Sequence, residues 1–252
     1  MAGLFGNWKK KRALDKIQVG EQEWLAVEAG LPFLDRLSSD ERRRMRQMAR
    51  EFLAEKEWNG AASLSLTRPI QISIALQACL PILELGLEHY RGWVGIVVYP
   101  GDFVIARSVM DPDGVVHEYD DPALGEAWEG GPVVLSWFDD PVDADGVNVV
   151  IHEFAHKLDM ENGAVDGLPR LSADMSRQAW ATAFEPAYKD FCRRVDGGEE
   201  TLLDPYAAEH PAEFFAVMSE AFFVTPVILC REYPEVYEQL REFYRQDPAR
   251  RS

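Results

Sequence analysis

The sequence has only three cysteines in 252 residues, and no two of them form a CxxC pair. Cys79, Cys192 and Cys230 are too few and too scattered for a disulfide framework, and they exclude a structural metal site built mainly from cysteine. We therefore expect a protein of the reducing cytoplasm, and we find no apolar leader that would predict secretion.

Basic residues are also scarce: 26 Lys and Arg stand against 43 Asp and Glu, which gives a net charge of −17. Such a surface repels phosphate backbones and anionic lipids, so we expect no direct binding to nucleic acid or membrane. Long apolar runs are missing as well. The most apolar stretch, Ile70 to Leu87, is interrupted by Gln71, Gln77, Pro81 and Glu84, and it predicts a buried helix rather than a membrane span.

Repeats and low-complexity linkers are absent too, which favours a single domain over residues 1–252. Within it we expect a helical portion at 1–68, a core at 69–225 and a C-terminal helix at 226–252. Short β-branched or aromatic segments separated by Pro and Gly predict a small, mainly antiparallel sheet with strands at Val94–Tyr99, Phe103–Val109, Val115–Tyr119 and Val133–Trp137. Helices before and after these strands indicate an α+β fold.

The segment NVVIHEFAHKLDMEN at 148–162 carries the candidate chemistry. Its apolar spacing predicts a helix that Asp143 or Asp145 caps and that Asn162-Gly163 ends. His152 and His156 lie one turn apart on that helix, so both imidazoles can reach a metal ion about 2 Å from each nitrogen. The spacing therefore predicts half of a metal site.

Glu153 lies about 100° further round the same helix, beside such an ion but badly placed to share in its coordination. It is suited instead to take a proton from a water that the metal has acidified. HExxH arises by chance in about one chain in a hundred of this composition, so two buried histidines bonded to backbone groups remain the alternative. The metzincin class is excluded because it requires Gly and His at the positions of Asp159 and Asn162.

A second segment, DPYAAEHPAEFFAVMSEAFF at 204–223, predicts another buried helix that begins at Pro211. Glu213 and Glu220 are seven residues apart and therefore lie on one side of this apolar helix, where carboxylates need a cation or strong donors. The alternatives are that Glu213 caps its own helix and that Glu220 lies at a solvent-exposed rim.

These residues resemble a known family. HEFAHKLDMENG followed by PYAAEHPAEFFAVMSEAFF, together with GPVVLSW at 131–137, is similar to the Mlc titration factor A family of zinc-dependent peptidases. The pattern HEFxHxxD with Tyr-x6-Glu-Phe-Phe-Ala is more distantly similar to the catalytic domain of anthrax lethal factor. The resemblance implies a zincin-like fold with one Zn²⁺ per chain, bound by His152, His156 and Glu213. It also implies that Glu153 is the general base and that Tyr206 stabilises the oxyanion or assists the leaving group.

By the same resemblance, an edge strand beside the cleft binds an extended peptide substrate, and its residues are Val133, Val134, Leu135, Ser136 and Trp137. From spacing alone, Asp159 is placed to support the histidines from behind the metal ligands, and Glu220 is placed to do the same from the other helix.

The leading hypothesis is a cytoplasmic zinc metallopeptidase of the gluzincin type, which takes peptides as substrates. The resemblance points to aminopeptidase activity, while the residues themselves leave exo- and endopeptidase activity open. The alternative hypothesis is a regulatory protein that sequesters an Mlc-like transcriptional repressor, with peptidase activity secondary.

Overall fold

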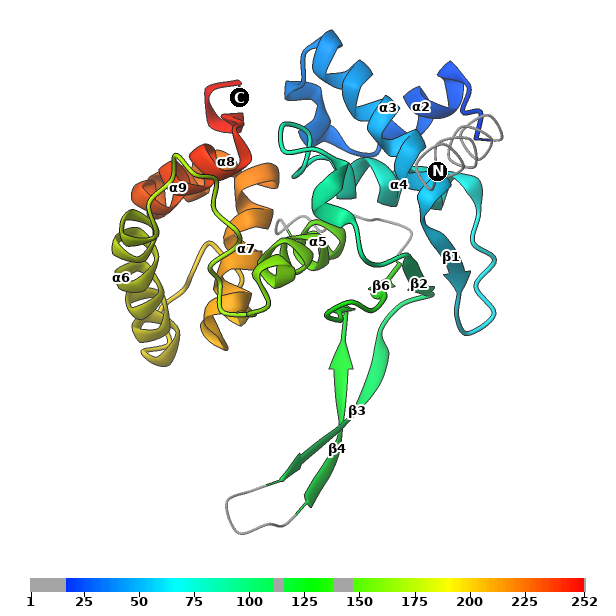
Figure 1. The fold of residues 1–252 in the computed structure, drawn as a ribbon. Helices are drawn as coiled ribbons and strands as arrows, with labels where there is room; N and C mark the ends of the chain where they lie inside the picture. Colours follow the sequence, from blue (N-terminus) through cyan, green and yellow to red (C-terminus); the bar gives the residue numbers. More distant parts are fainter. Residues whose placement is uncertain (1–16, 111–115, 138–146, 252) are drawn as a thin grey trace, which may run out of the picture.

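The computed structural model describes residues 17–110, 116–137 and 147–251. Helices form most of the body, and a two-stranded hairpin projects from it (Figure 1). The first half contains α2 (Glu21–Glu28), η1 (Pro32–Arg36), α3 (Ser39–Glu55), α4 (Arg68–Cys79) and η2 (Leu87–Tyr90). The second half contains α5 (Val149–Asp159), η3 (Met160–Asn162), α6 (Arg177–Asp196), η4 (Pro205–Ala208), α7 (Pro211–Val224), α8 (Pro226–Glu232), α9 (Pro234–Tyr244) and η5 (Pro248–Arg251).

A four-stranded sheet has the order β1-β2-β6-β5, formed by β1 (Glu57–Gly60), β2 (Gly95–Tyr99), β6 (Val133–Ser136) and β5 (Gly125–Ala127). β1 and β6 run parallel to β2, whereas β5 is antiparallel to β6. The α+β class is confirmed, but the prediction of a mainly antiparallel sheet is wrong. Parallel pairing needs long connections, and the chain supplies them, since α4 and η2 join β1 to β2.

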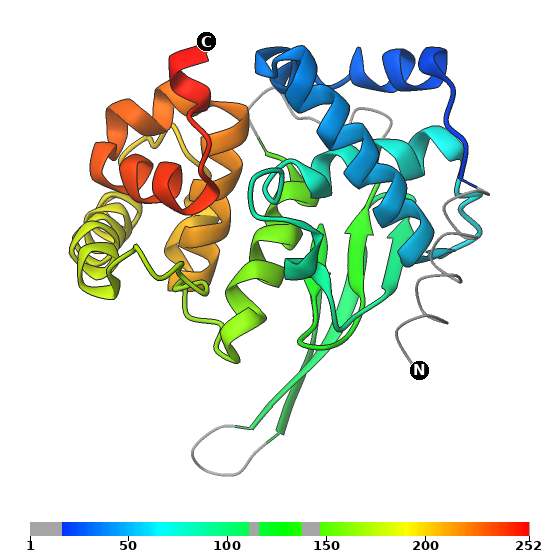
Figure 2. The same cartoon turned by 45° about the horizontal axis from the view of Figure 1, so that its top comes forward.

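The second sheet is a hairpin of β3 (Phe103–Met110) and β4 (Val116–Ala123), which pair antiparallel. It extends away from the rest of the molecule in two views (Figures 1 and 2), and β5 begins two residues after the end of β4. Each predicted strand overlaps an observed one. β1 and β5 were not predicted, because EWNG and GEA are short and lack β-branched residues.

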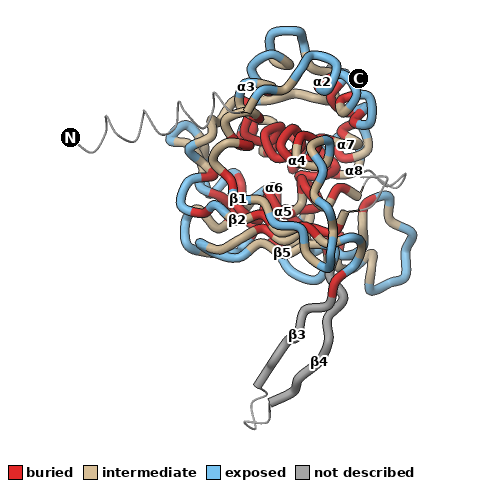
Figure 3. Tube along the Cα trace, turned by 90° about the vertical axis from the view of Figure 1, so that its right-hand side faces the viewer, coloured by how far each residue is buried: buried red, intermediate tan, exposed pale blue. Residues whose placement is uncertain are grey.

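Helix α5 lies at the centre of the molecule, where it contacts β5, β6, α4 and α7 (Figure 2). The buried core surrounds it and runs from Trp24 near the start of the described chain to Tyr244 near its end (Figure 3). The predicted C-terminal helix comprises two helices, because Pro234 at the start of α9 cannot continue α8. None of the described helices is both long and apolar enough to cross a membrane.

Candidate metal centre

Helix α5 carries the HEFAH segment and begins at Val149, later than the sequence predicts. Its N-cap is Asn148, whose side-chain Oδ1 accepts a 2.9 Å hydrogen bond from the backbone N–H three residues on. An Asn directly before the apolar run was the available signal for this cap. Asp143 and Asp145, the predicted caps, lie outside the described residues. From Glu153 onward every α5 residue is buried, so polar groups on this helix need partners inside the protein.

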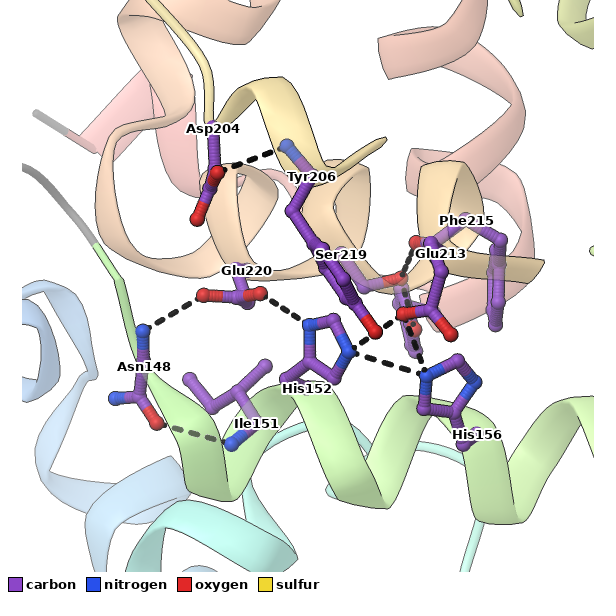
Figure 4. A network of polar contacts seen from close by, with 11 residues as sticks. Asn148, Ile151, His152, His156, Asp204, Tyr206, Glu213, Phe215, Ser219 and Glu220 are labelled. Atoms are coloured by element: carbon purple, nitrogen blue, oxygen red, sulfur yellow. Dashed lines mark hydrogen bonds and ion pairs between the residues drawn. The ribbon is translucent and has the colours of Figure 1, made fainter. Parts of the chain in front are cut away.

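His152 and His156 point from α5 toward Glu213 on α7 (Figure 4). Glu213 Oε2 lies 3.0 Å from His152 Nε2 and 3.1 Å from His156 Nε2, and the two Nε2 atoms lie 3.1 Å apart. Zinc–ligand distances of about 2 Å place tetrahedral ligand atoms about 3.3 Å from one another, close to these separations. Among the described residues, the side chains of His152, His156 and Glu213 form a group that could hold a metal ion, and we call these three the metal-ligand group.

Glu220 lies behind this group and is only 5% exposed, so it is not a rim residue. Its Oε1 lies 2.6 Å from His152 Nδ1, and its Oε2 accepts a 2.7 Å hydrogen bond from the N–H of Asn148. When Nδ1 donates to Glu220, the Nε2 of a neutral His152 carries a lone pair that faces the carboxylate of Glu213. The lone pair of His152 Nε2 and the Glu213 carboxylate are both acceptors and lie only 3.0 Å apart, so a cation is needed between them. The set of side-chain atoms therefore fits a metal ion.

The electrostatics of His152 lead to the same conclusion. Burial lowers the pKa of His152, but its hydrogen bonds to Glu213 and Glu220 raise it well above the usual value. The two carboxylates thus favour positive charge at this position, and a metal cation provides that charge without protonating the imidazole.

Glu213 lies in the first turn of α7, which starts at Pro211 as predicted. His210 caps this helix, since its Nδ1 accepts a 3.2 Å hydrogen bond from the N–H of Ala212. The Glu213 carboxylate faces the two histidines of α5 instead of its own helix end. Burial acts to raise the pKa of Glu213, but the hydrogen bonds from both histidines outweigh this effect. The pKa of Glu213 therefore lies below its usual value. The carboxylate is therefore ionised, as a metal ligand must be.

Glu153 lies beside the metal-ligand group at 4% exposure, and its Oε2 has no hydrogen-bond partner among the described residues. Burial raises the pKa of Glu153 to about 7, although the neighbouring histidines act to lower it. A carboxyl group that titrates near neutral pH is suited to general-base chemistry. Strand β5 passes so close that a Cβ atom on Gly125 would overlap the Glu153 carboxylate. No local sequence pattern predicts that the missing side chain of Gly125 leaves room for the Glu153 carboxylate.

Tyr206 lies in η4, the turn that precedes α7, and its side chain is half exposed. Its ring centroid is 6.1 Å from that of His152, and the side chain extends toward the metal-ligand group (Figure 4). Asp204 caps η4 by accepting a 2.9 Å hydrogen bond from the N–H of Tyr206. The phenol is thus within reach of a ligand bound beside His152.

Asp159 is fully buried at the end of α5. Its Oδ2 accepts a 2.9 Å hydrogen bond from the N–H of Gly167, and a Cβ atom on Gly167 would overlap the backbone of Pro211 in α7. Asp159 therefore links the end of α5 to the helix that carries Glu213. Asp159 Oδ1 and His156 Nδ1 are buried without hydrogen-bond partners among the described residues, so direct support of His156 by this carboxylate stays a prediction.

The prediction of an edge strand at Val133–Trp137 is wrong. β6 pairs with β2 on one side and with β5 on the other, so both of its backbone edges are occupied. β5 is the edge strand on this side of the sheet, and it borders a cavity of about 490 Å³ that is also lined by Tyr206 and the metal-ligand group. Sequence similarity favoured the longer apolar strand, while the strand at the cleft is the short one next to it.

A family model described as glucose-regulated metallo-peptidase M90 matches residues 5–245 of this chain. The chain is 38% identical to Mlc titration factor A from Klebsiella pneumoniae over 249 residues, which cover 97% of this chain and 92% of that protein. It is 37% identical to Mlc titration factor A from Salmonella arizonae over 236 residues, 91% of this chain and 93% of the relative. For the protein of that name from Yersinia pestis, identity is 38% over 226 residues, 88% and 83% of the two chains. The resemblance seen in three short segments is confirmed along most of the sequence, and the chain belongs to the glucose-regulated metallopeptidase M90 family.

Proposed function

We propose that this protein is a zinc-dependent peptidase with a zincin-like active site. The observation that carries the proposal is the convergence of two imidazole nitrogens and one carboxylate oxygen within 3.1 Å of one another. His152, His156 and Glu213 would hold the ion, and two neutral nitrogens with one oxygen are a donor set typical of catalytic zinc. Bound zinc supplies Lewis-acid chemistry that acidifies water and polarises a peptide carbonyl.

The remaining steps fall to residues of the chain. Glu153 accepts a proton from the attacking water and then delivers it to the departing amine, for which its pKa of about 7 is well matched. Tyr206 donates a hydrogen bond to the oxygen on which negative charge develops. Glu220 holds His152 in the tautomer that leaves Nε2 available.

An extended peptide would lie along β5. The antiparallel register with β6 pairs Gly125 with Leu135 and Ala127 with Val133, and Leu124 accepts a hydrogen bond from Ser136. In such a ladder alternate residues bond across the pair, so the backbone groups of Gly125 and Ala127 point away from β6 and toward the free edge. They can pair with a substrate backbone, which would bring the scissile bond past Glu153.

Metal analysis and peptide hydrolysis test the proposal together. We expect about one zinc per chain and cleavage of short amino-acid amides or peptides by the zinc-loaded protein. Glu153→Gln should lower kcat by about 10²–10⁴-fold while leaving the zinc content unchanged, because the amide cannot accept a proton. Full activity in this variant would exclude the mechanism.

Aminopeptidase specificity is a finer prediction, and paired substrates with a free or an acetylated N-terminus separate exo- from endopeptidase activity. An aminopeptidase cleaves only the free form, whereas an endopeptidase cleaves both.

A second candidate function is binding of an Mlc-like repressor in the cytoplasm. It is favoured by the name of the relatives, Mlc titration factor A, and the net charge of −17 suits a basic partner surface. A pull-down of purified repressor with Glu153→Gln tests it: binding by this variant supports sequestration without catalysis, and absence of binding at micromolar concentrations excludes it.

A further inference from the structure

Lys157 directly follows His156, a candidate metal ligand, yet the Lys157 side chain is not part of the metal-ligand group. It is 4% exposed, and its Nζ donates hydrogen bonds to the backbone carbonyl oxygens of Trp128 at 2.5 Å and Gly131 at 2.9 Å. The ammonium also lies 4.7 Å from the ring centroid of Trp93. Its described polar contacts are therefore carbonyl oxygens of one distant segment.

That segment is the turn between β5 and β6. The N–H of Gly131 donates to the carbonyl of Trp128 at 3.0 Å, and the N–H of Trp128 donates to the carbonyl of Pro132 at 3.2 Å. Lys157 thus binds carbonyls at both ends of the turn. β5 has three residues and one strand neighbour, so its position depends on its contacts with α5 as well as on its pairing with β6.

Burying this ammonium is costly. Burial lowers the pKa of Lys157 to about 8, and a second ammonium group, that of Lys56, lies 3.5 Å from the centroid of the same Trp93 ring. An apolar side chain at position 157 would avoid the desolvation cost but would release the turn. Two charge-assisted hydrogen bonds and a cation–π contact offset that cost, and their geometric result is a fixed distance between α5 and the β5–β6 turn.

We propose that Lys157 is a positioning residue that holds the edge strand β5 at the cleft, so that substrates long enough to pair with this strand bind productively. The proposal rests on the proposed peptidase function. Helix α5 is the rigid element that connects the two features. His152 and His156 on α5 are candidate metal ligands, and Lys157 on the same helix holds β5 in place through the β5–β6 turn. Lys157 itself touches neither the metal-ligand group nor the substrate.

Two substrates separate positioning from general damage. An alanine 4-nitroanilide reaches only the metal-ligand group, whereas a hexapeptide cleaved at its centre also pairs with β5. Lys157→Met keeps the apolar stem and removes the three donors, and it should raise KM for the hexapeptide about tenfold or more. kcat and KM for the anilide, and the zinc content, should stay within about twofold. Lys157→Arg should recover part of the hexapeptide KM, and the exposed Lys189→Met is the matched control.

Equal losses on both substrates, or an unchanged hexapeptide KM, overturn the proposal. Hydrogen exchange followed by mass spectrometry provides a readout that needs no activity: Lys157→Met should speed exchange in residues 124–137 while α7 keeps its protection. If the wild-type protein cleaves neither substrate, the proposed function fails, and unchanged exchange in 124–137 then overturns the positioning role separately.

Discussion

Replacing Glu220 by Gln tests whether the second carboxylate of α7 controls the metal-ligand group. The Glu220 carboxylate accepts from two donors, His152 Nδ1 at 2.6 Å and the N–H of Asn148 at 2.7 Å. The glutamine amide has one acceptor oxygen and one NH₂ donor in place of the two carboxylate oxygens. In either orientation of the amide, the NH₂ group therefore faces His152 Nδ1 or the N–H of Asn148, each of which is itself a donor. One buried donor loses its partner, which costs about 1–3 kcal/mol.

The cost should appear mainly in metal affinity, because loss of the Nδ1 bond releases the tautomer and orientation of His152. We expect the zinc dissociation constant of Glu220→Gln to rise about 10–100-fold, equivalent to about 1.4–2.7 kcal/mol. Competition between the protein and a chromogenic zinc chelator measures this constant. Glu185→Gln, which removes the same charge from an exposed position on α6, is the control. Unchanged zinc affinity in Glu220→Gln, with the fold intact by circular dichroism, would refute the reasoning.

Further predictions concern the rest of the cleft. Gly125→Ala places a methyl group where the Glu153 carboxylate lies, so we expect kcat to fall at least tenfold with zinc content retained, measured by steady-state kinetics. Tyr206→Phe should lower kcat about 10–100-fold with little change in KM, and an unchanged kcat would exclude the phenol as a donor to the oxyanion. Because Glu153 must be deprotonated to act, kcat/KM should fall as pH drops through its pKa; burial sets that pKa to about 7 and bound zinc lowers it, so the acid limb should lie at or below pH 7. Removing the metal with a chelator should abolish hydrolysis and lower the thermal unfolding temperature, and added zinc should restore both.

Much of the candidate site was predictable because its information is local. The i, i+4 spacing of His152 and His156 follows from helix geometry alone, and so does the common side of Glu213 and Glu220. The predicted strands overlap observed ones because alternating β-branched segments between turns are local signals as well. Similarity to a known family then joined the two segments, which are about fifty residues apart.

Other features depend on contacts that no local pattern encodes. β6 is an apolar strand and was taken for the edge, but edge or centre is decided by which strands pair on either side. The short β5 is recognisable only once it is seen next to Glu153, where Gly125 leaves room for the carboxylate. No local pattern assigns a role to Lys157 either, because the carbonyl oxygens that its ammonium binds belong to the distant β5–β6 turn.

The sequence by itself determined the two helices of the site, the residue types they carry and the family to which the chain belongs, because helical periodicity and motif spacing are properties of consecutive residues. Only the tertiary structure decided that the Glu213 carboxylate contacts both histidines, that Glu220 contacts Nδ1 of His152 and that β5 borders the cleft. These facts depend on how α5, α7 and the sheet pack against one another, and packing is the sum of many long-range contacts rather than of any one segment.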